Sequence, residues 1–332
     1  MTPNRRRFLE VAGTAATIGA IGPPTWLAVA SRDEHEDELP AYSRWLTLED
    51  GTLEFTAIDW AALEAYVENE LEDVSPDEEV PAEFEDDPMI APASEGLLST
   101  YFFVALTLAP FGLGRLLEAE AFESTVERLL EVNGAFVVTG EIVVEEIDEQ
   151  LTAEPVADFM RQLEVTDAIG EYDVYTPVEG DSDAAIAVDD EALVVAAGAD
   201  TADEAMATLE TAIGTAEGDV DRATDEAGEF AWLLETAGDG EVCFGEYGDL
   251  ADPTFDFEGL EDAAGVVSSL TVEDEETSSG EFAAIVADPD EATLEAVLGV
   301  SGEEQSVEVD GDRVTATATW REEVTPTGDL TR

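Results

Sequence analysis

The feature that most constrains the fold of this chain is its charge: 82 acidic side chains stand against 12 basic ones, a net charge of -70 over 332 residues. All the basic residues are arginine, and lysine is absent. In ordinary buffer such a charge expands a compact chain by self-repulsion. Since 45% of the residues are hydrophobic, a core can still form, and disorder through low hydrophobicity is a poor interpretation.

Salt reconciles the charge with a compact fold. At several molar salt the Debye length falls to roughly 2 Å, which screens the repulsion between surface carboxylates. We therefore interpret most of the acidity as a solvated, salt-adapted surface that holds hydrated K⁺ and Na⁺ nonspecifically. The same charge argues against nucleic acid and against an anionic membrane surface as partners.

The N-terminus carries a different pattern. Asn4 precedes Arg5 and Arg6, then one variable position, then the apolar pair Phe8 and Leu9. An uncharged stretch runs from position 11 to 30 and ends in an A-x-A pattern, Ala28 and Ala30, before Ser31.

This region resembles the twin-arginine (Tat) signal peptides of haloarchaeal secreted proteins, with Glu10 where a lysine is usual. The resemblance covers about thirty residues, and the lysine-free acidic composition is also similar to haloarchaeal proteins. It implies export of a folded chain by the twin-arginine route to the cell exterior or envelope. Cleavage before Ser31 and retention of the segment as an anchor both remain open. We infer no cofactor from this route.

A second uncharged segment, 96–114, is 19 residues long, which as a helix is roughly 28 Å, close to the thickness of a bilayer. Pro110, Gly112 and Gly114 lie in its last third. Its strongest part, 97–109, has the length of a buried core helix. We favour a core helix, with a membrane segment as the alternative.

The remaining patterns predict an α+β protein with antiparallel or mixed sheets and helices packed on one face. Hairpins are predicted at Asp50-Gly51 and Asp310-Gly311. Further predictions concern single elements, as follows: helices after Asp59, over 119–132 with a stop at Asn133-Gly134, after Thr201 with a stop at Gly214, around Phe230 up to Gly238, and from Asp288-Pro289 to Gly299; strands at 135–139, 184–188, 192–197, 266–271 and 282–287.

Four apolar strands run into helices, beginning at Phe55, Phe136, Leu193 and Phe282. A duplicated strand-helix-hairpin unit and a chance recurrence are both open. We predict a signal peptide at 1–30 and two α+β domains, 31–218 and 219–332, with a boundary near Gly218.

The small number of histidine, cysteine and lysine residues excludes several reaction classes. His35 is the single histidine and lies in a charged leader, so histidine-based triads and metal sites lack their residues. The single cysteine, Cys243, has apolar neighbours and is expected in a core strand. With no lysine, Schiff-base chemistry is excluded as well.

Carboxylates remain as candidate catalytic or metal-binding groups. Short D-x-D pairs occur at Asp181/Asp183, Asp219/Asp221, Asp288/Asp290 and Asp310/Asp312, a frequency that a chain this acidic reaches by chance. None has the spacing of a calcium loop, so no catalytic, cofactor or metal residue is assigned.

We therefore expect an exported binding or envelope-associated module with an unidentified partner, rather than an enzyme. The alternative is a secreted hydrolase that uses a carboxylate pair. Two converging carboxylates of raised pKa in a pocket would favour the hydrolase, and a broad exposed apolar patch would favour the module.

Overall fold

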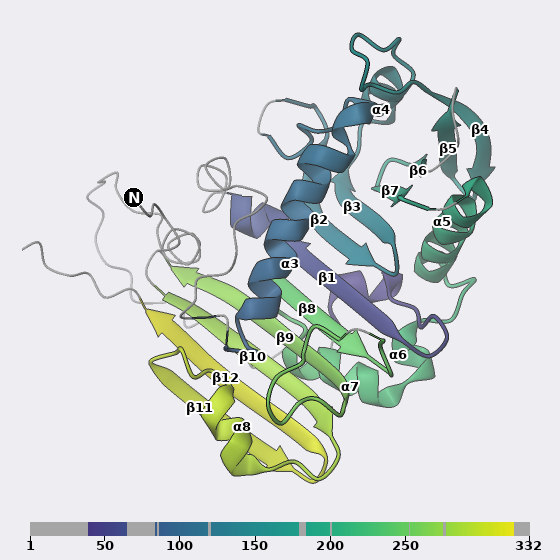
Figure 1. Ribbon diagram of the computed structural model, residues 1–332. Helices are drawn as coiled ribbons and strands as arrows, with labels where there is room; N and C mark the ends of the chain where they lie inside the picture. The colour runs from purple at the N-terminus through teal and green to yellow at the C-terminus, as the bar shows by residue number, and fades with distance from the viewer. Residues whose placement is uncertain are drawn as a thin grey trace, which may run out of the picture.

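The computed structural model describes residues 39–64, 84, 86–118, 121–178, 184–199, 201–251, 253–274 and 277–321. Their centre is one antiparallel sheet of twelve strands in the order β11-β12-β10-β9-β8-β1-β2-β3-β7-β6-β5-β4 (Figure 1). This confirms the α+β class with an antiparallel sheet. The strands are β1 (Leu53–Asp59), β2 (Thr125–Val132), β3 (Ala135–Glu141), β4 (Leu163–Ile169), β5 (Tyr172–Pro177), β6 (Ala184–Val188), β7 (Ala192–Ala197), β8 (Val242–Tyr247), β9 (Ala263–Asp274), β10 (Thr277–Val286), β11 (Glu304–Asp310) and β12 (Arg313–Arg321).

Helices cover both faces of the sheet, where the sequence indicated one covered face. The face called here the α3 face has Ile58, Leu129 and Phe244 in its core, and the α5 face has Phe55, Leu130 and Cys243 in its core. On the α3 face lie α3 (Ala91–Phe102), α4 (Val144–Leu151) and α8 (Glu291–Val297); on the α5 face lie the 3₁₀ helix η1 (Ala41–Trp45), α5 (Ala202–Glu217), α6 (Ala223–Glu226) and α7 (Gly228–Ala237). The reason is that strands inside the sheet are covered on both sides, as in β8 at the centre, which is buried at all positions but its last.

The two halves of the sheet share a strand order. One half runs β2-β3-β7-β6 outward from the centre and the other runs β9-β10-β12-β11, while β1 and β8 pair antiparallel between them. A helix follows β3 and β10 in the same place, α4 in one half and α8 in the other. Phe136 and Phe282, the starts of two of the predicted echoes, both lie in the core of the α3 face. The strand order thus supports the duplicated unit, with the β4-β5 hairpin added at one edge.

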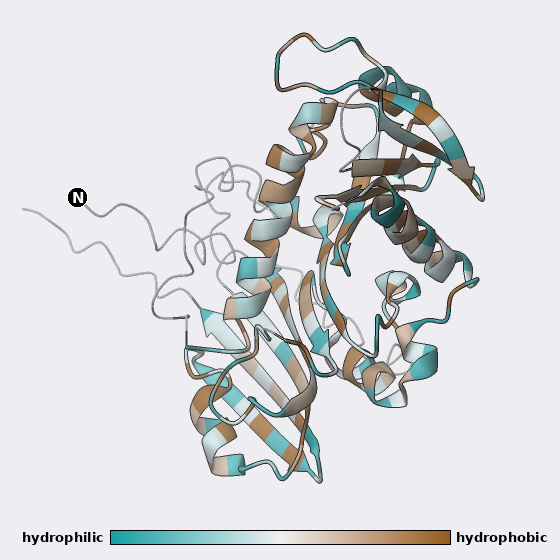
Figure 2. Cartoon of the chain, turned by 45° about the vertical axis from the view of Figure 1, so that its right-hand side comes forward, coloured by the Kyte–Doolittle hydropathy of each residue, from teal (hydrophilic) through white to brown (hydrophobic). Residues whose placement is uncertain are grey.

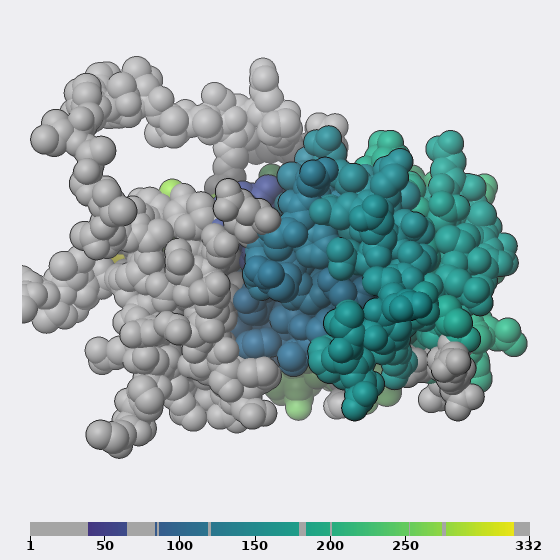
Figure 3. Space-filling view, turned by 90° about the horizontal axis from the view of Figure 1, so that it is seen from above, coloured from purple at the N-terminus to yellow at the C-terminus, as the bar shows by residue number. Residues whose placement is uncertain are grey.

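Figure 2 shows apolar residues interspersed with hydrophilic ones along the strands of both halves. Seen from above, the segments coloured blue and teal lie together at one end of the molecule (Figure 3). In the strand order, β1 to β7 build one wing of the sheet and β8 to β12 build the other.

The helix predicted over 119–132 was wrong, because Thr125–Val132 is strand β2. Asn133 and Gly134, interpreted as a helix stop, have φ of 46° and 76° and form the two-residue turn between β2 and β3. Asn-Gly suits a type I′ hairpin turn, in which both central residues need positive φ.

The two predicted Asp-Gly turns form. Asp310-Gly311 opens the turn of the β11-β12 hairpin, where Asp310 pairs with Arg313. Asp50 and Gly51 have positive φ between the bridged residues Glu49 and Thr52. Before Asp50-Gly51 the chain forms η1 and the isolated bridge at Glu49, rather than the paired strand of a hairpin.

Helix starts were predicted better than helix ends. Thr201 caps α5 by accepting a hydrogen bond from the N–H of Glu204, as predicted. The stop at Gly214 was wrong, since α5 continues to Gly218, which has φ of 87°. At α8 the capping side chain is Asp290, which accepts a bond from the N–H of Thr293, rather than Asp288.

The apolar segment 96–114 packs as a core element. Its first part is α3, which lies on β1, β2, β8 and β9, followed by a π-helical turn and a 3₁₀ turn. The stretch Ala91–Phe111 is long and apolar enough to cross a membrane, and 44% of its apolar window is buried. In this fold its apolar face completes the α3-face core.

Strands from both sides of position 218 belong to the same sheet. α5 ends at Gly218, and β8 beyond it pairs with β1 from before it, Ala57 opposite Cys243. The division into 31–218 and 219–332 stays a prediction.

Candidate functional site

Three glutamates stand in a row on adjacent strands at the centre of the sheet. Glu54 on β1 lies directly opposite Glu246 on β8. Glu131 on β2 is opposite Thr56, one step along the same face of β1. All three alternate with residues of the α5-face core, so they point to the α3 face. We call Glu54, Glu131 and Glu246 the glutamate row.

Burial and mutual repulsion make these carboxyls hard to ionise. Burial raises the pKa of Glu131 above its ordinary 4.5. Burial, then the charges of Glu246 and Glu131, raise the pKa of Glu54. Like charges on opposing strand positions repel, which is the second cause of the raised pKa of Glu54.

Glu246 differs from its neighbours in its hydrogen bonds. Its side chain is only 5% exposed, and its carboxylate accepts bonds from the backbone N–H groups of Thr254 and Phe255. Burial raises its pKa, and these two bonds act in the opposite direction. The row therefore combines a carboxylate held by donors with the more exposed carboxyl of Glu54.

Glu54 and Glu131 of the row line a cavity of about 450 Å³ between the sheet centre and α3, which we call the sheet-centre cavity. Its polar lining includes the side chains of Glu49, Glu54, Glu95 and Glu131. Gly96 and Ser99 of α3 and Phe244 of β8 form further parts of its wall. A second cavity of about 500 Å³ lies beside it and contains Glu246, with Leu250 lining both.

Gly96 brings α3 close to the sheet at this point. A Cβ at Gly96 would lie 2.9 Å from Cγ2 of Thr56, so a larger residue would push the helix away. Burial, followed by the neighbouring charge of Asp50, also raises the pKa of Glu49 at the rim. No arginine is among the described residues that line either cavity.

Chemically, this arrangement offers hydrogen-bond acceptors and negative charge to a small molecule. It suits ligands with ammonium or hydroxyl groups. A pair of carboxyl groups is also what most glycosidases use for catalysis. Within the described ranges, no group of three or more His, Cys, Asp or Glu side chains is arranged to hold a metal ion.

The residues singled out from sequence lie elsewhere. The signal residues Arg5, Arg6, Phe8 and Leu9, the cleavage residues Ala28, Ala30 and Ser31, and also His35 and Asp181/Asp183 lie outside the described residues. Asp290 is a helix cap and Asp310 ends a hairpin strand, so neither belongs to the site. Cys243 is a buried strand residue, as expected; burial raises the pKa of its thiol to about 12.

Sequence reasoning missed the glutamate row. The pattern that could have revealed it is a glutamate between apolar strand residues, as in Leu53-Glu54-Phe55 and Leu130-Glu131-Val132. Only the strand register shows that three such positions are neighbours.

Comparison with known proteins gives no family. No family model matches the chain, and no curated protein matches it. Among solved structures, crystal form III of TP0453 is similar at a TM-score of 0.45 and 10% identity, covering 86% of this chain and 95% of that one. Crystal form I of TP0453 has the same TM-score at 9% identity, covering 86% of this chain and 94% of that one. Similarity at this level says nothing about function.

Proposed function

We propose that this protein is an exported, salt-adapted binding module and that the sheet-centre cavity is its ligand site. The observation that carries the proposal is the cavity of about 450 Å³, whose lining includes Glu54 and Glu131, both with raised pKa. Its volume lies in the range of small-molecule pockets, about 300–1,000 Å³. The N-terminal resemblance to twin-arginine signals supports placement outside the cell.

The ligand suited to this cavity is a small molecule that carries ammonium or hydroxyl groups. A cation near Glu54 and Glu131 favours their ionised forms, so its binding should release protons. The affinity for a cation should therefore rise with pH above the ordinary glutamate pKa of 4.5. A neutral polyol lacks this dependence, which distinguishes the two classes.

The test is calorimetric titration in 3 M KCl with spermidine, glucosamine and glucose as probes. We expect binding of at least one probe, and loss of it in the double variant Glu54→Gln/Glu131→Gln. Glu308→Gln, an exposed glutamate of strand β11, is the matched control and should bind as the unchanged protein does. Equal affinity of all three proteins, or no binding of any probe, would contradict the assignment of this cavity.

A second candidate function has its own observation. Glu54 and Glu246 are cross-strand neighbours with unlike surroundings: Glu54 is exposed, and Glu246 accepts bonds from two backbone N–H groups. A glycosidase needs such a division between a proton donor and an ionised partner. Release of nitrophenol from nitrophenyl glycosides, lost in Glu54→Gln and in Glu246→Gln, would establish a hydrolase and displace the binding module.

A further inference from the structure

A recess of about 360 Å³ lies on the α5 face, between η1 and strands β2 and β3. Tyr42, Arg44 and Trp45 of η1 form one wall, and Arg128 of β2 and Thr139 of β3 lie on the sheet side. It is separate from the sheet-centre cavity, because the sheet stands between the two faces. We call it the arginine recess.

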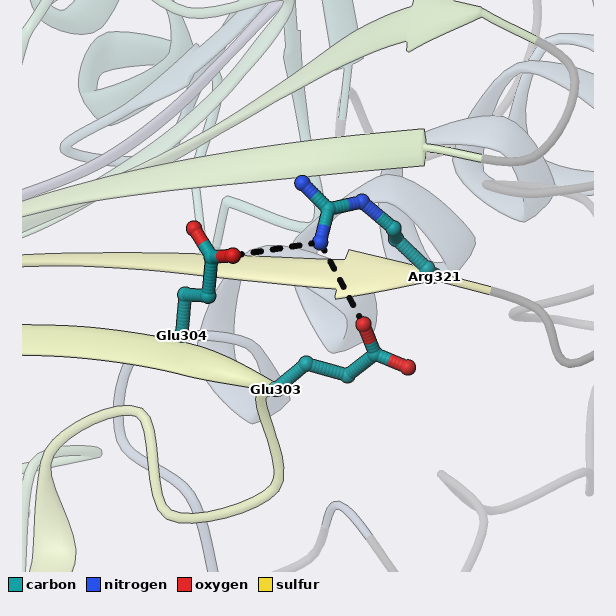
Figure 4. A network of polar contacts seen from close by, with 3 residues as sticks. All are labelled: Glu303, Glu304 and Arg321. Carbon is teal, nitrogen blue, oxygen red and sulfur yellow. Dashed lines mark hydrogen bonds and ion pairs between the residues drawn. The ribbon is translucent and has the colours of Figure 1, made fainter.

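Two arginines in one recess is unusual for this chain, which has 12 basic residues against 82 acidic ones. Three of the other described arginines are hydrogen-bonded or ion-paired, whereas Arg313 lies over the ring of Trp232. Arg321 contacts both Glu303 and Glu304 (Figure 4). Arg222 donates to two backbone carbonyls, and Arg115 pairs with Glu118.

The arginines of the recess are bound more loosely. Arg44 has its guanidinium carbon 5.2 Å from the ring centre of Trp45, and it forms no hydrogen bond or ion pair with any other described residue. Arg128 has one long contact, 3.5 Å to Oδ2 of Asp59, whose other oxygen accepts from the N–H of Ala62. Both guanidinium groups therefore keep donors for a further acceptor.

The other residues that line the recess indicate which kind of hydrogen-bond acceptor could bind to the two arginines. A guanidinium donates two parallel bonds to a carboxylate, and the mostly buried side chains of Tyr42, Trp45 and Leu130 form the apolar floor beside it. Glu127 and Glu191 also line the recess, so a polyanion would meet like charges there. A single carboxylate on an apolar body satisfies both conditions.

We propose that the arginine recess binds a small organic carboxylate, with Arg44 and Arg128 as its partners and the aromatic side chains of η1 against its hydrocarbon part. The cation-selective chemistry proposed for the sheet-centre cavity does not enter this proposal. The two proposed sites lie on opposite faces of one sheet.

The test uses 4-fluorobenzoate as the probe, followed by ¹⁹F NMR line broadening and shift in 3 M KCl, so that chloride competes equally with every variant. We expect saturable binding of 4-fluorobenzoate and none of 4-fluorobenzyl alcohol, which has the same ring without the charge. Arg44→Gln and Arg128→Gln should each weaken binding about tenfold or more, as expected for loss of a charge-assisted bond. Arg44→Lys keeps the charge without the planar fork and should give an intermediate loss.

Two controls keep the outcome interpretable. Arg321→Gln removes an arginine outside the recess and should leave binding unchanged, as should Glu54→Gln/Glu131→Gln in the other cavity. Circular dichroism confirms that each variant is folded. Equal binding of the acid and the alcohol, no binding of either, or an equal loss in Arg321→Gln would overturn the proposal.

Discussion

The buried carboxylate of Asp87 accepts a hydrogen bond from the backbone N–H of Gly299, 3.0 Å away and 212 residues further along the chain. Its second oxygen accepts from the N–H and the hydroxyl of Ser301, which in turn accepts from the indole N–H of Trp320. Asp87 precedes α3, and Gly299 follows α8. This one side chain therefore fixes the start of the helix that covers the sheet centre to the C-terminal wing.

Replacing Asp87 by alanine should lower the free energy of unfolding by about 3 kcal/mol or more, because several buried donors lose their acceptor together. The measurement is urea unfolding in 3 M KCl. Asp86→Ala, at an exposed neighbouring position, should change stability by less than about 0.5 kcal/mol. A similar effect of both substitutions would show that the network is not a stabilising contact.

Gly245 lies under the ring of Phe55 in the centre of the sheet, where the two residues are cross-strand partners. A Cβ at Gly245 would lie 2.7 Å from Cζ of Phe55, which is fully buried. Gly245→Ala should therefore cost about 1–3 kcal/mol in the same unfolding assay. Gly228→Ala has no atom within 4 Å of the new Cβ and should be neutral or stabilising.

The stability of the folded protein should fall as the pH rises, because several of its carboxyls have a raised pKa. Burial raises the pKa of Glu54, Glu131 and Glu246 above 4.5, so the folded protein binds more protons than the unfolded chain. Stability should then be full below about pH 4.5 and fall as pH rises through the raised values. Asp290, whose pKa is lowered from 3.8 by bonds from Thr293, acts oppositely and only below that interval.

Unfolding followed in 3 M KCl between pH 4.5 and 7 checks this prediction. Glu54→Gln/Glu131→Gln should flatten the slope, whereas Glu308→Gln should leave it unchanged, since Glu308 is exposed on β11. The prediction is contradicted if stability rises with pH. It is also contradicted if the double variant shows the same pH dependence as the unchanged protein, because the glutamate row would then not be its cause.

Salt should be required for folding, because a net charge of -70 repels itself in dilute buffer. Dialysis from 3 M KCl to about 0.1 M KCl, where the Debye length is about 10 Å, should abolish the circular dichroism of the folded state. Melting curves that coincide at the two concentrations would contradict salt adaptation.

The export proposal predicts different roles for adjacent arginines. Arg5→Lys/Arg6→Lys should retain the protein inside the cell, whereas Arg7→Lys, at the variable position, should leave export intact. Intact mass of protein from medium and membrane measures both location and cleavage. A species that begins at Ser31 shows a cleaved signal, and a membrane species that begins at the N-terminus shows an anchor.

Local turns and caps could be predicted because few residues decide them. Asp310-Gly311 and the Thr201 cap were predicted from sequence and are present in the structure. Over 119–132 the same reasoning failed, since the spacing of Phe122, Val126 and Leu129 suits a helix and only pairing with β1 and β3 makes it a strand. The β4-β5 hairpin was not predicted either, because mostly exposed β4 lacks an apolar pattern.

The sequence by itself determined the strongly acidic composition, the α+β class and the short-range turns, because each depends on composition or on neighbours in the chain. Only the tertiary structure decided that Glu54, Glu131 and Glu246 form one row and that Arg44 and Arg128 share one recess. The first grouping depends on the register of β1 with β2 and β8, and the second depends on how η1 packs against β2 and β3. A slip of one residue in a strand would turn its glutamate to the opposite face of the sheet.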